Sequence, residues 1–264
     1  MTHIGKARRL RRLVDAAGRA VLIPMDHGVS NGPVDGLVDP RAAVAAVARG
    51  GATGVIVHKG LVRTIDGALG ATPLLVHLSA STALNPRPND KRLVGTVEEC
   101  VALGADAVSI HVNVGDERES DMLEDFGRVS ADCERLGMPL LAMMYPRGKD
   151  IRDPHAVENV KHVTRLAAEL GADIVKAPYT GSVETFREVV RGCPMPVVIS
   201  GGPRSESPEA FLRMVADARA AGGAGVSVGR NVWQHASPEA MTRAISAIVF
   251  KGASVDDALR ALKA

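Results

Sequence analysis

Aromatic residues are scarce in this sequence, whose 264 residues include four Phe, two Tyr and one Trp. Hydrophobic residues nevertheless make up 46% of the chain and charged residues 23%, a balance that excludes an intrinsically disordered protein. The chain can therefore bury a core, and we expect that core to be aliphatic.

The sequence also has few cysteines, a small net charge and no long apolar run. The three cysteines (Cys100, Cys133 and Cys193) have no CxxC spacing, which argues against a disulfide framework and a zinc–thiolate site. A net charge of +2 argues against nucleic-acid binding. No apolar run approaches the roughly 20 residues that span a bilayer, and the basic run near the N-terminus lacks the apolar stretch of a signal peptide. We expect a cytoplasmic protein that binds neither nucleic acids nor membranes.

The sequence does contain eight short apolar runs bounded by Gly, Pro or Asp. They are near-continuous rather than alternating, which is typical of strands buried on both faces of a parallel sheet. Eight runs in 264 residues give about 33 residues per unit, the size of one strand with its crossover helix. The runs are residues 20–26, 54–58, 73–78, 105–112, 139–145, 172–176, 196–200 and 224–228.

Helix signals lie between these runs. A capping side chain followed by proline predicts a helix start, because proline is tolerated in the first helical turn. Such pairs are Asp39-Pro40, Asp153-Pro154, Ser207-Pro208 and Ser237-Pro238. Glycines before three of the strands predict left-handed helix ends. These are Gly51, Gly104 and Gly171.

The alternation of strands and helices predicts an α/β fold, a single (β/α)8 TIM barrel over residues 1–264 with an N-terminal helical extension at 1–19. The competing fold is a doubly wound open sheet. No GxGxxG motif follows the first run, which weakens the dinucleotide-binding form of that competitor.

Polar residues end every predicted strand. In such a barrel the chemistry lies at the C-terminal ends of the strands, so these residues are the candidate site. In chain order they are Asp26-His27, His58-Lys59, His77 and Ser79, His111 and Asn113, Tyr145 and Arg147, Lys176, Ser200-Gly201-Gly202, and Gly229-Arg230.

Lys176 ends an apolar strand, where burial favours a neutral amine that can attack a ketone and form a Schiff base. Lys59 has similar surroundings, and either lysine could instead pair with a carboxylate or a phosphate, so local sequence does not choose between them. Tyr145 and Asp26 are candidates for proton transfer, with barrel-rim, capping or ion-pair roles as the alternatives.

Two glycine turns follow the seventh and eighth predicted strands, where this architecture customarily binds phosphate. They contain Ser200, Gly201 and Gly202 in the first turn and Gly229 and Arg230 in the second. Arg230 can add a bidentate contact. We predict a small phosphorylated metabolite as ligand, with Arg147 and His27 as further substrate-binding residues.

Two other functions stay open at this point. His27, His58, His77 and His111 end the first four strands, which would suit a divalent metal site in a metal-dependent aldolase or epimerase, although no HxH or HExxH spacing is present. The second alternative is a barrel that binds a phosphorylated ligand without turning it over.

Taken together, these motifs resemble the archaeal-type class I (Schiff-base) aldolase family. The matching phrases are Pro24-Met25-Asp26-His27-Gly28, His111-Val112-Asn113-Val114-Gly115, Ala142-Met143-Met144-Tyr145-Pro146-Arg147-Gly148-Lys149, Asp173-Ile174-Val175-Lys176, Gly201-Gly202-Pro203 and Val228-Gly229-Arg230-Asn231. The resemblance implies that Lys176 forms the Schiff base, that Tyr145 transfers protons and that Asp26 is the third catalytic residue. It also implies that the two glycine turns and Arg230 hold phosphate.

Within this family, Met143 stands where fructose-bisphosphate aldolases carry a tryptophan, so the chain is more similar to the branch of 2-amino-3,7-dideoxy-D-threo-hept-6-ulosonate synthases. That resemblance implies a small phosphorylated ketose as donor and L-aspartate semialdehyde as acceptor, on a route to 3-dehydroquinate and the aromatic amino acids. Alternatives within the family are a dihydroxyacetone phosphate-dependent aldolase of secondary metabolism and a class I fructose-bisphosphate aldolase. The resemblance further implies no metal or other cofactor and a ring-shaped homo-oligomer such as a decamer.

Overall fold

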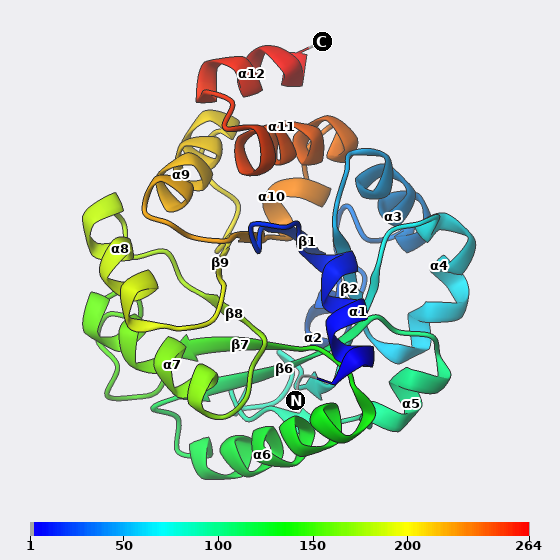
Figure 1. Ribbon diagram of the computed structural model, residues 1–264, viewed down its shortest axis with the longest axis vertical. Helices are drawn as coiled ribbons and strands as arrows, with labels where there is room; N and C mark the ends of the chain where they lie inside the picture. Colours follow the sequence, from blue (N-terminus) through cyan, green and yellow to red (C-terminus); the bar gives the residue numbers. More distant parts are fainter. Residues whose placement is uncertain (1–2, 264) are drawn as a thin grey trace.

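The computed structural model describes residues 3–263 and confirms a closed eight-stranded parallel barrel (Figure 1). Neighbouring strands follow the order β1-β10-β9-β8-β7-β6-β3-β2, and β2 closes the ring by pairing with β1. The barrel strands are β1 (Ala20–Pro24), β2 (Gly54–Val57), β3 (Leu74–His77), β6 (Ala107–Val114), β7 (Leu140–Pro146), β8 (Ile174–Ala177), β9 (Val197–Ser200) and β10 (Gly225–Ser227). The doubly wound open sheet is therefore excluded.

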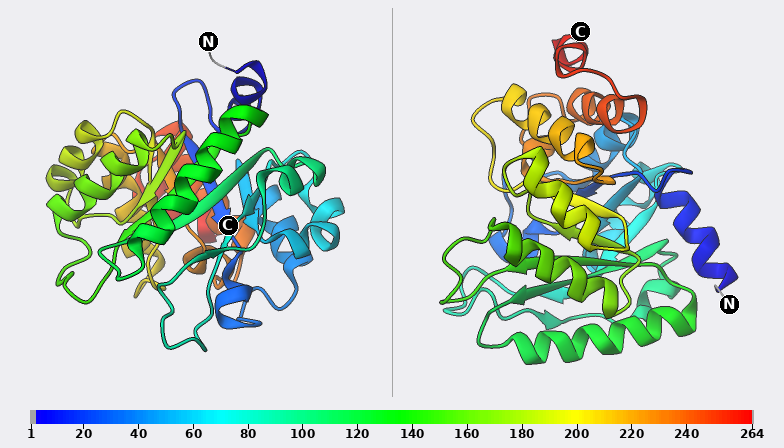
Figure 2. Two further views of the ribbon diagram at one scale, coloured as in Figure 1. Left: turned by 90° about the horizontal axis from the view of Figure 1, so that it is seen from below. Right: turned by 60° about the vertical axis from the view of Figure 1, so that its left-hand side comes forward.

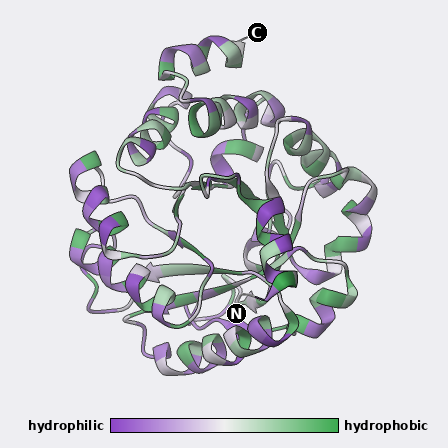
Figure 3. Ribbon diagram, viewed as in Figure 1, coloured by the Kyte–Doolittle hydropathy of each residue, from purple (hydrophilic) through white to green (hydrophobic). Residues whose placement is uncertain are grey.

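The helices surround this barrel, and the hydropathy colouring of Figure 3 shows apolar and polar bands along them. Such banding is expected where one face of a helix packs on the sheet and the other meets solvent. The helices are α1 (Ile4–Leu13), α2 (His27–Asn31), α3 (Pro40–Arg49), η1 (Lys59–Leu61), α4 (Val62–Leu69), α5 (Val97–Ala102), α6 (Glu119–Leu136), α7 (Val157–Glu169), α8 (Val183–Gly192), α9 (Pro208–Ala220), α10 (Arg230–Trp233), α11 (Pro238–Lys251) and α12 (Val255–Lys263).

Three of the four predicted helix starts are confirmed. The side chains of Asp39, Ser207 and Ser237 each accept a hydrogen bond from the helix they precede. The prediction for Asp153 was wrong, because its carboxylate accepts instead from the backbone N–H of His155, two residues on, at 2.8 Å. That local turn uses the capping oxygen, and the helix begins later, at Val157.

The core has two layers. The larger cluster lies between the helices and the sheet, and it includes Phe126, Phe186 and Phe211, all at most 1% exposed. The smaller cluster fills the barrel interior with aliphatic side chains such as Leu22, Ile56, Leu75, Leu141 and Ile174. This arrangement confirms the aliphatic character that the low aromatic count predicts for the barrel.

Helix α1 lies against the N-terminal end of the barrel, as the two views of Figure 2 show. Its residues Leu10 and Leu13, with Val14 just beyond it, pack on the interior cluster. Arg12 pairs with Asp106 at 2.5 Å, which ties the helix to the start of β6. The helix thereby covers this end, so the interior opens at the C-terminal ends of the strands.

One two-stranded hairpin interrupts the alternation of strands and helices. It consists of β4 (Ser79–Ala80) and β5 (Arg92–Leu93), which pair antiparallel between β3 and α5. The connecting residues 81–91 lie beside the mouth of the barrel, since several of them line the cavity described next.

Candidate active site

A cavity of about 290 Å³ lies at the C-terminal ends of the barrel strands. Ten predicted residues line it: Asp26, His27, His58, His77, Ser79, His111, Tyr145, Arg147, Lys176 and Arg230. A larger cavity of about 660 Å³ lies at the opposite end, between α1 and the start of β6, and is lined mainly by arginines. We place the site in the smaller cavity, because it brings together a lysine, a carboxylate, a phenol and several imidazoles.

Strand periodicity explains why these side chains point inward. Successive residues of a strand face opposite sides, so positions two apart share a face. Lys176 follows Ile174, and Tyr145 follows Met143, by two residues, and both Ile174 and Met143 belong to the interior cluster. The same spacing from Leu75 brings His77 into the interior.

Lys176 is buried, with 6% of its surface exposed. It pairs in register with Met143 of β7, whose Sδ lies 3.9 Å from Nζ. Within residues 3–263, no carboxylate lies within 4.0 Å of the amine, since Asp26 has only His27 and His77 as ion-pair partners. An amine in this position is held in the cavity by packing rather than by a salt bridge.

Lys59 lies outside the cavity. It belongs to η1, after β2, and its Nζ pairs with Glu99 of α5 at 2.9 Å. The structure thereby separates two lysines that local sequence leaves equivalent.

Asp26 follows β1, and its carboxylate faces two imidazoles. Oδ1 lies 3.5 Å from Nδ1 of His27 and Oδ2 lies 3.8 Å from Nε2 of His77. Burial alone would raise the pKa of Asp26, but the neighbouring His27, His77 and Lys176 together hold it well below its usual value. Asp26 is therefore an anion near the amine.

His77 is a buried neutral imidazole. Its Nδ1 lies 2.8 Å from Ser109 Oγ on the paired strand β6, which fixes the ring. Burial lowers the pKa of His77 to about 3, against the opposing effect of the Asp26 carboxylate. His77 can thus position Asp26, but it does not act as a cation at neutral pH.

Tyr145 lies between two polar neighbours at the end of β7. Its ring centroid is 4.9 Å from that of His111 and 4.4 Å from the guanidinium carbon of Arg147. His111 in turn lies 2.9 Å from the side-chain oxygen of Asn113 through Nε2. These contacts orient the phenol over the cavity that also holds Lys176.

Tyr179, the second tyrosine of the chain, does not line the cavity. Its ring packs on Phe186 of α8, with centroids 5.3 Å apart, in the layer between helices and sheet. Burial raises the pKa of Tyr179 to about 12. Its position two residues beyond β8 turns it away from the barrel interior.

Of the predicted phosphate turns, Arg230 lines the cavity, whereas Ser200, Gly201, Gly202 and Gly229 are not among its lining residues. Within residues 3–263, the backbone N–H groups of the three glycines and Arg230 donate to no protein acceptor. A Cβ on Gly229 would lie 2.8 Å from the Pro24 carbonyl oxygen and 2.9 Å from Trp233 Nε1, so a side chain does not fit there. These are the properties of a backbone anion cradle.

Sequence reasoning missed Asn231 and Lys91. The Asn231 side chain donates to the carbonyls of Gly201 and Pro203, and accepts from the Ser205 N–H at 2.7 Å, so it shapes the first turn. Lys91 lines the cavity from the β4–β5 hairpin. The spacing of the apolar runs gave no signal for this hairpin, because the 26 residues between the third and fourth runs are as many as between the fourth and fifth runs.

Each of the four histidines of the metal alternative packs on another ring. His27 packs on Trp233, His58 on His77, and His111 on Tyr145. Across residues 3–263, no three His, Cys, Asp or Glu side chains are grouped so that they could hold one metal ion. None of the helices in this range combines the length and apolar character needed to cross a membrane.

Comparison with known proteins identifies the family. Residues 20–235 match the sequence profile described as DeoC/LacD family aldolase. The chain is 46% identical over 259 residues, 98% of its length and 97% of the relative's, to 2-amino-3,7-dideoxy-D-threo-hept-6-ulosonate synthase of Halobacterium salinarum. It is 43% identical over 232 residues, covering 88% of this chain and 85% of the other, to 2-amino-4,5-dihydroxy-6-oxo-7-(phosphonooxy)heptanoate synthase of Streptomyces griseus.

A solved structure agrees with this assignment. The Schiff base forming fructose-1,6-bisphosphate aldolase superimposes with a TM-score of 0.87 at 32% identity, covering 93% of this chain and all of the other. The resemblance to class I aldolases is thereby confirmed, and the chain is an enzyme that belongs to the DeoC/LacD family of aldolases.

Proposed function

We propose that this enzyme joins a three-carbon unit from a ketose phosphate to L-aspartate semialdehyde through a Schiff base on Lys176. The observation that supports this most directly is a buried amine without a carboxylate partner, facing a cavity that also contains Asp26 and Tyr145. An amine in such a site can attack a ketone, whereas an ion-paired surface lysine such as Lys59 cannot do so as readily.

The proposed reaction begins when Lys176 Nζ adds to the donor ketone and water leaves, which forms an iminium. The iminium accepts the electron pair of the breaking carbon–carbon bond, so an aldehyde departs and an enamine stays on the lysine. The enamine carbon then attacks the aldehyde carbon of the acceptor, and hydrolysis of the new iminium releases the product. Tyr145 and Asp26 move the protons that these steps require.

The donor phosphate lies, in this proposal, against the N–H groups of Gly201, Gly202, Gly229 and Arg230. The Ser200 hydroxyl and the Arg230 guanidinium add side-chain contacts, and His27 and Arg147 contact the rest of the substrate. The scheme requires neither a metal nor another cofactor.

The names of the relatives support L-aspartate semialdehyde as the acceptor. Both printed names describe seven-carbon 2-amino compounds, which is the sum of a four-carbon amino-acid aldehyde and a three-carbon unit. The Streptomyces griseus name keeps a phosphonooxy group in the product, which supports dihydroxyacetone phosphate addition as a second candidate reaction.

Three experiments test the proposal. Incubation with donor and borohydride should add the donor mass irreversibly at Lys176; full activity of Lys176→Met, or inactivation by chelators, would contradict it in favour of metal chemistry. Tyr145→Phe should lose turnover while the borohydride adduct still forms. Mass spectrometry of products from aspartate semialdehyde with a deoxy-ketofructose phosphate or with dihydroxyacetone phosphate distinguishes the two candidate reactions.

The ring-shaped homo-oligomer and the cytoplasmic location belong to this proposal too. Light scattering of the purified enzyme tests the subunit number, and a monomer would contradict it.

A further inference from the structure

Lys91 is a cation whose place in the proposed reaction is not yet explained. It is half-buried on the β4–β5 hairpin, lines the active-site cavity, and donates to Ser81 Oγ at 2.5 Å. No carboxylate within the described range 3–263 lies within 4.0 Å of its amine, although Arg92, its neighbour, pairs with both Asp90 and Asp121.

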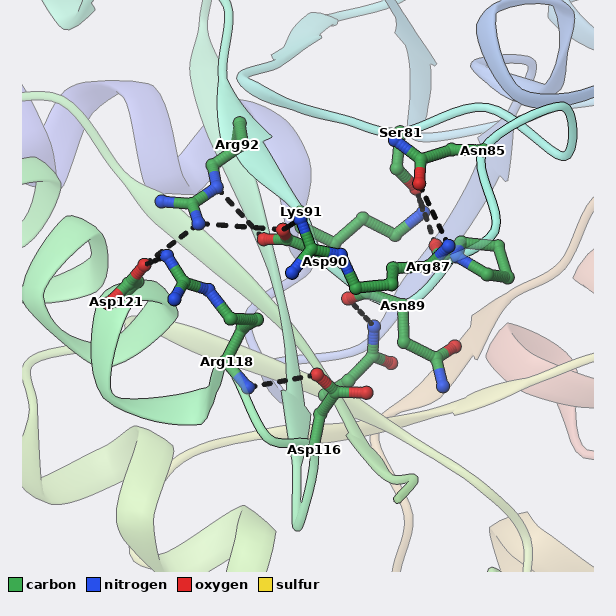
Figure 4. Close-up of polar contacts among 12 residues, drawn as sticks. Ser81, Asn85, Arg87, Asn89, Asp90, Lys91, Arg92, Asp116, Arg118 and Asp121 are labelled. Atoms are coloured by element: carbon green, nitrogen blue, oxygen red, sulfur yellow. Dashed lines mark hydrogen bonds and ion pairs between the residues drawn. The ribbon is translucent and has the colours of Figure 1, made fainter. Parts of the chain in front are cut away.

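The hairpin holds Lys91 in place through contacts with the barrel (Figure 4). Arg92 pairs with Asp90 and Asp121 of α6 at 2.8 Å each, which joins the base of the hairpin to that helix. At the other side of Lys91, the Asn113 side chain of β6 donates to the Asn89 carbonyl oxygen at 2.7 Å. Contacts on both sides of one residue fix the direction of its backbone, so Lys91 is positioned over the cavity.

The ring order places Lys91 opposite the proposed phosphate cradle. The cradle follows β9 and β10, whereas the hairpin lies between β3 and β6, on the far side of the eight-membered ring. Lys176 on β8 and Arg147 after β7 lie along the arc between them. A substrate that spans the cavity can therefore meet one cationic group at each end with the reactive amine between them.

The charges of the cavity are unbalanced. Among its lining residues in the described chain, Asp26 is the one acid, against the four cations Lys91, Arg147, Lys176 and Arg230. Burial, followed by the nearby charge of Arg147, lowers the pKa of Lys91 against the opposing effect of the Asp26 carboxylate. In the proposed reaction the donor phosphate is the anionic partner of Arg230, but Lys91 and Arg147 have no anionic partner.

We propose that Lys91, together with Arg147, binds the carboxylate of the acceptor and so makes the enzyme select an amino-acid aldehyde over an uncharged aldehyde. This inference rests on the proposed function for the identity of the acceptor. Lys91 is a specificity-determining residue here, since the proposed bond-making steps take place at Lys176, between Lys91 and the phosphate cradle.

The test compares Lys91→Met with Lys91→Arg and with Lys149→Met, a matched control on the exposed loop after β7 and outside the cavity. For Lys91→Met, the KM for aspartate semialdehyde should rise about 10- to 100-fold, as expected for the loss of a charge-assisted contact. The KM for propanal, which has no carboxylate, and the borohydride adduct with donor should stay unchanged. Lys91→Arg should restore most of the affinity.

A binding measurement without turnover separates this inference from the proposed function. L-Homoserine, a stable analogue of the acceptor, should bind the parent enzyme more tightly than 3-amino-1-propanol, which lacks the carboxylate, and Lys91→Met should remove that difference. If no borohydride adduct forms in the parent enzyme, the Schiff-base proposal fails while the homoserine result still decides this one.

Two results would overturn the inference. One is an equal loss for aspartate semialdehyde and propanal, which would indicate a structural role. The other is a raised KM for fructose 1,6-bisphosphate with no change for aspartate semialdehyde, which would assign Lys91 to a second phosphate.

Discussion

Because His77 is buried and neutral, the free energy of unfolding of this enzyme should fall as the pH is lowered. Burial lowers the pKa of His77 to about 3, whereas histidine in an unfolded chain titrates near about 6.5. Below pH 6.5 the unfolded chain therefore takes up a proton that the folded chain does not. The stabilisation is fully present above pH 6.5 and is lost progressively as the pH falls toward 3.

The size of the effect follows from the two pKa values. Each pH unit below the unfolded value is worth about 1.4 kcal/mol, so the free energy of unfolding should fall by about 2 kcal/mol between pH 7 and pH 5 through His77 alone. Protonation of the folded state contributes almost nothing in this window. His58 and His111, whose pKa values burial also lowers, change the stability in the same direction.

The assay is urea unfolding at pH 7 and pH 5, at equal protein concentration, followed by the fluorescence of Trp233 and by circular dichroism. The variant His77→Gln can still meet Ser109 but has no group that titrates in this window, so its pH dependence should be about 2 kcal/mol smaller than that of the parent. His162→Gln, on the exposed surface of α7, is the control and should keep the parent's dependence. Identical pH dependence in His77→Gln and the parent would refute the neutral state of His77.

Three further predictions concern other parts of the molecule. Gly229→Ala should move the second phosphate turn, because the added Cβ meets Pro24 and Trp233. The KM for the phosphorylated donor should rise about 10-fold or more while the circular dichroism spectrum stays unchanged, and an unchanged KM would contradict the proposed phosphate cradle. Burial raises the pKa of the thiols of Cys100 and Cys133 to about 12, so iodoacetamide at pH 8 should label neither in the folded enzyme and both in urea, as mass spectrometry would reveal. Leu13→Ala should lower the free energy of unfolding by about 2–5 kcal/mol in denaturant titration while kcat stays the same, and a lost kcat would show that α1 supports the site directly.

The strands were predictable because their signal is local. Each is a short aliphatic run that is buried on both faces, and all eight lie within two residues of the predicted bounds, as β6 (Ala107–Val114) shows against the expected 105–112. The start of the helix after Asp153 was not predictable, because an aspartate side chain can either cap a helix or close a turn. Whether Asp153 caps a helix or closes a turn depends on the residues that follow, and the Asp153-Pro154 pair alone does not include them.

The site was predictable to the extent that it follows strand ends. Lys176, Tyr145 and Asp26 were predicted as site residues because they end strands, where a barrel of this type carries its chemistry, and the cavity brings the three together. The choice between Lys176 and Lys59 needed the partner Glu99, which is 40 residues away in sequence from Lys59. Lys91 was missed because it lies on a polar hairpin, whose position over the barrel depends on contacts with β6 and α6 rather than on any pattern of its own.

Helix α1 packs on the interior cluster at the N-terminal end of the barrel, and the cavity that contains Lys176 lies at the other end, beside the β4–β5 hairpin. In the proposed reaction, the water lost when Lys176 condenses, the departing aldehyde and the acceptor that follows would all pass through this mouth of the barrel. Substrates and products would therefore enter and leave one after another, and an acceptor that binds before the donor would block the donor from reaching Lys176. Excess acceptor should inhibit the enzyme when donor is scarce, so the order of binding is set by access rather than by affinity.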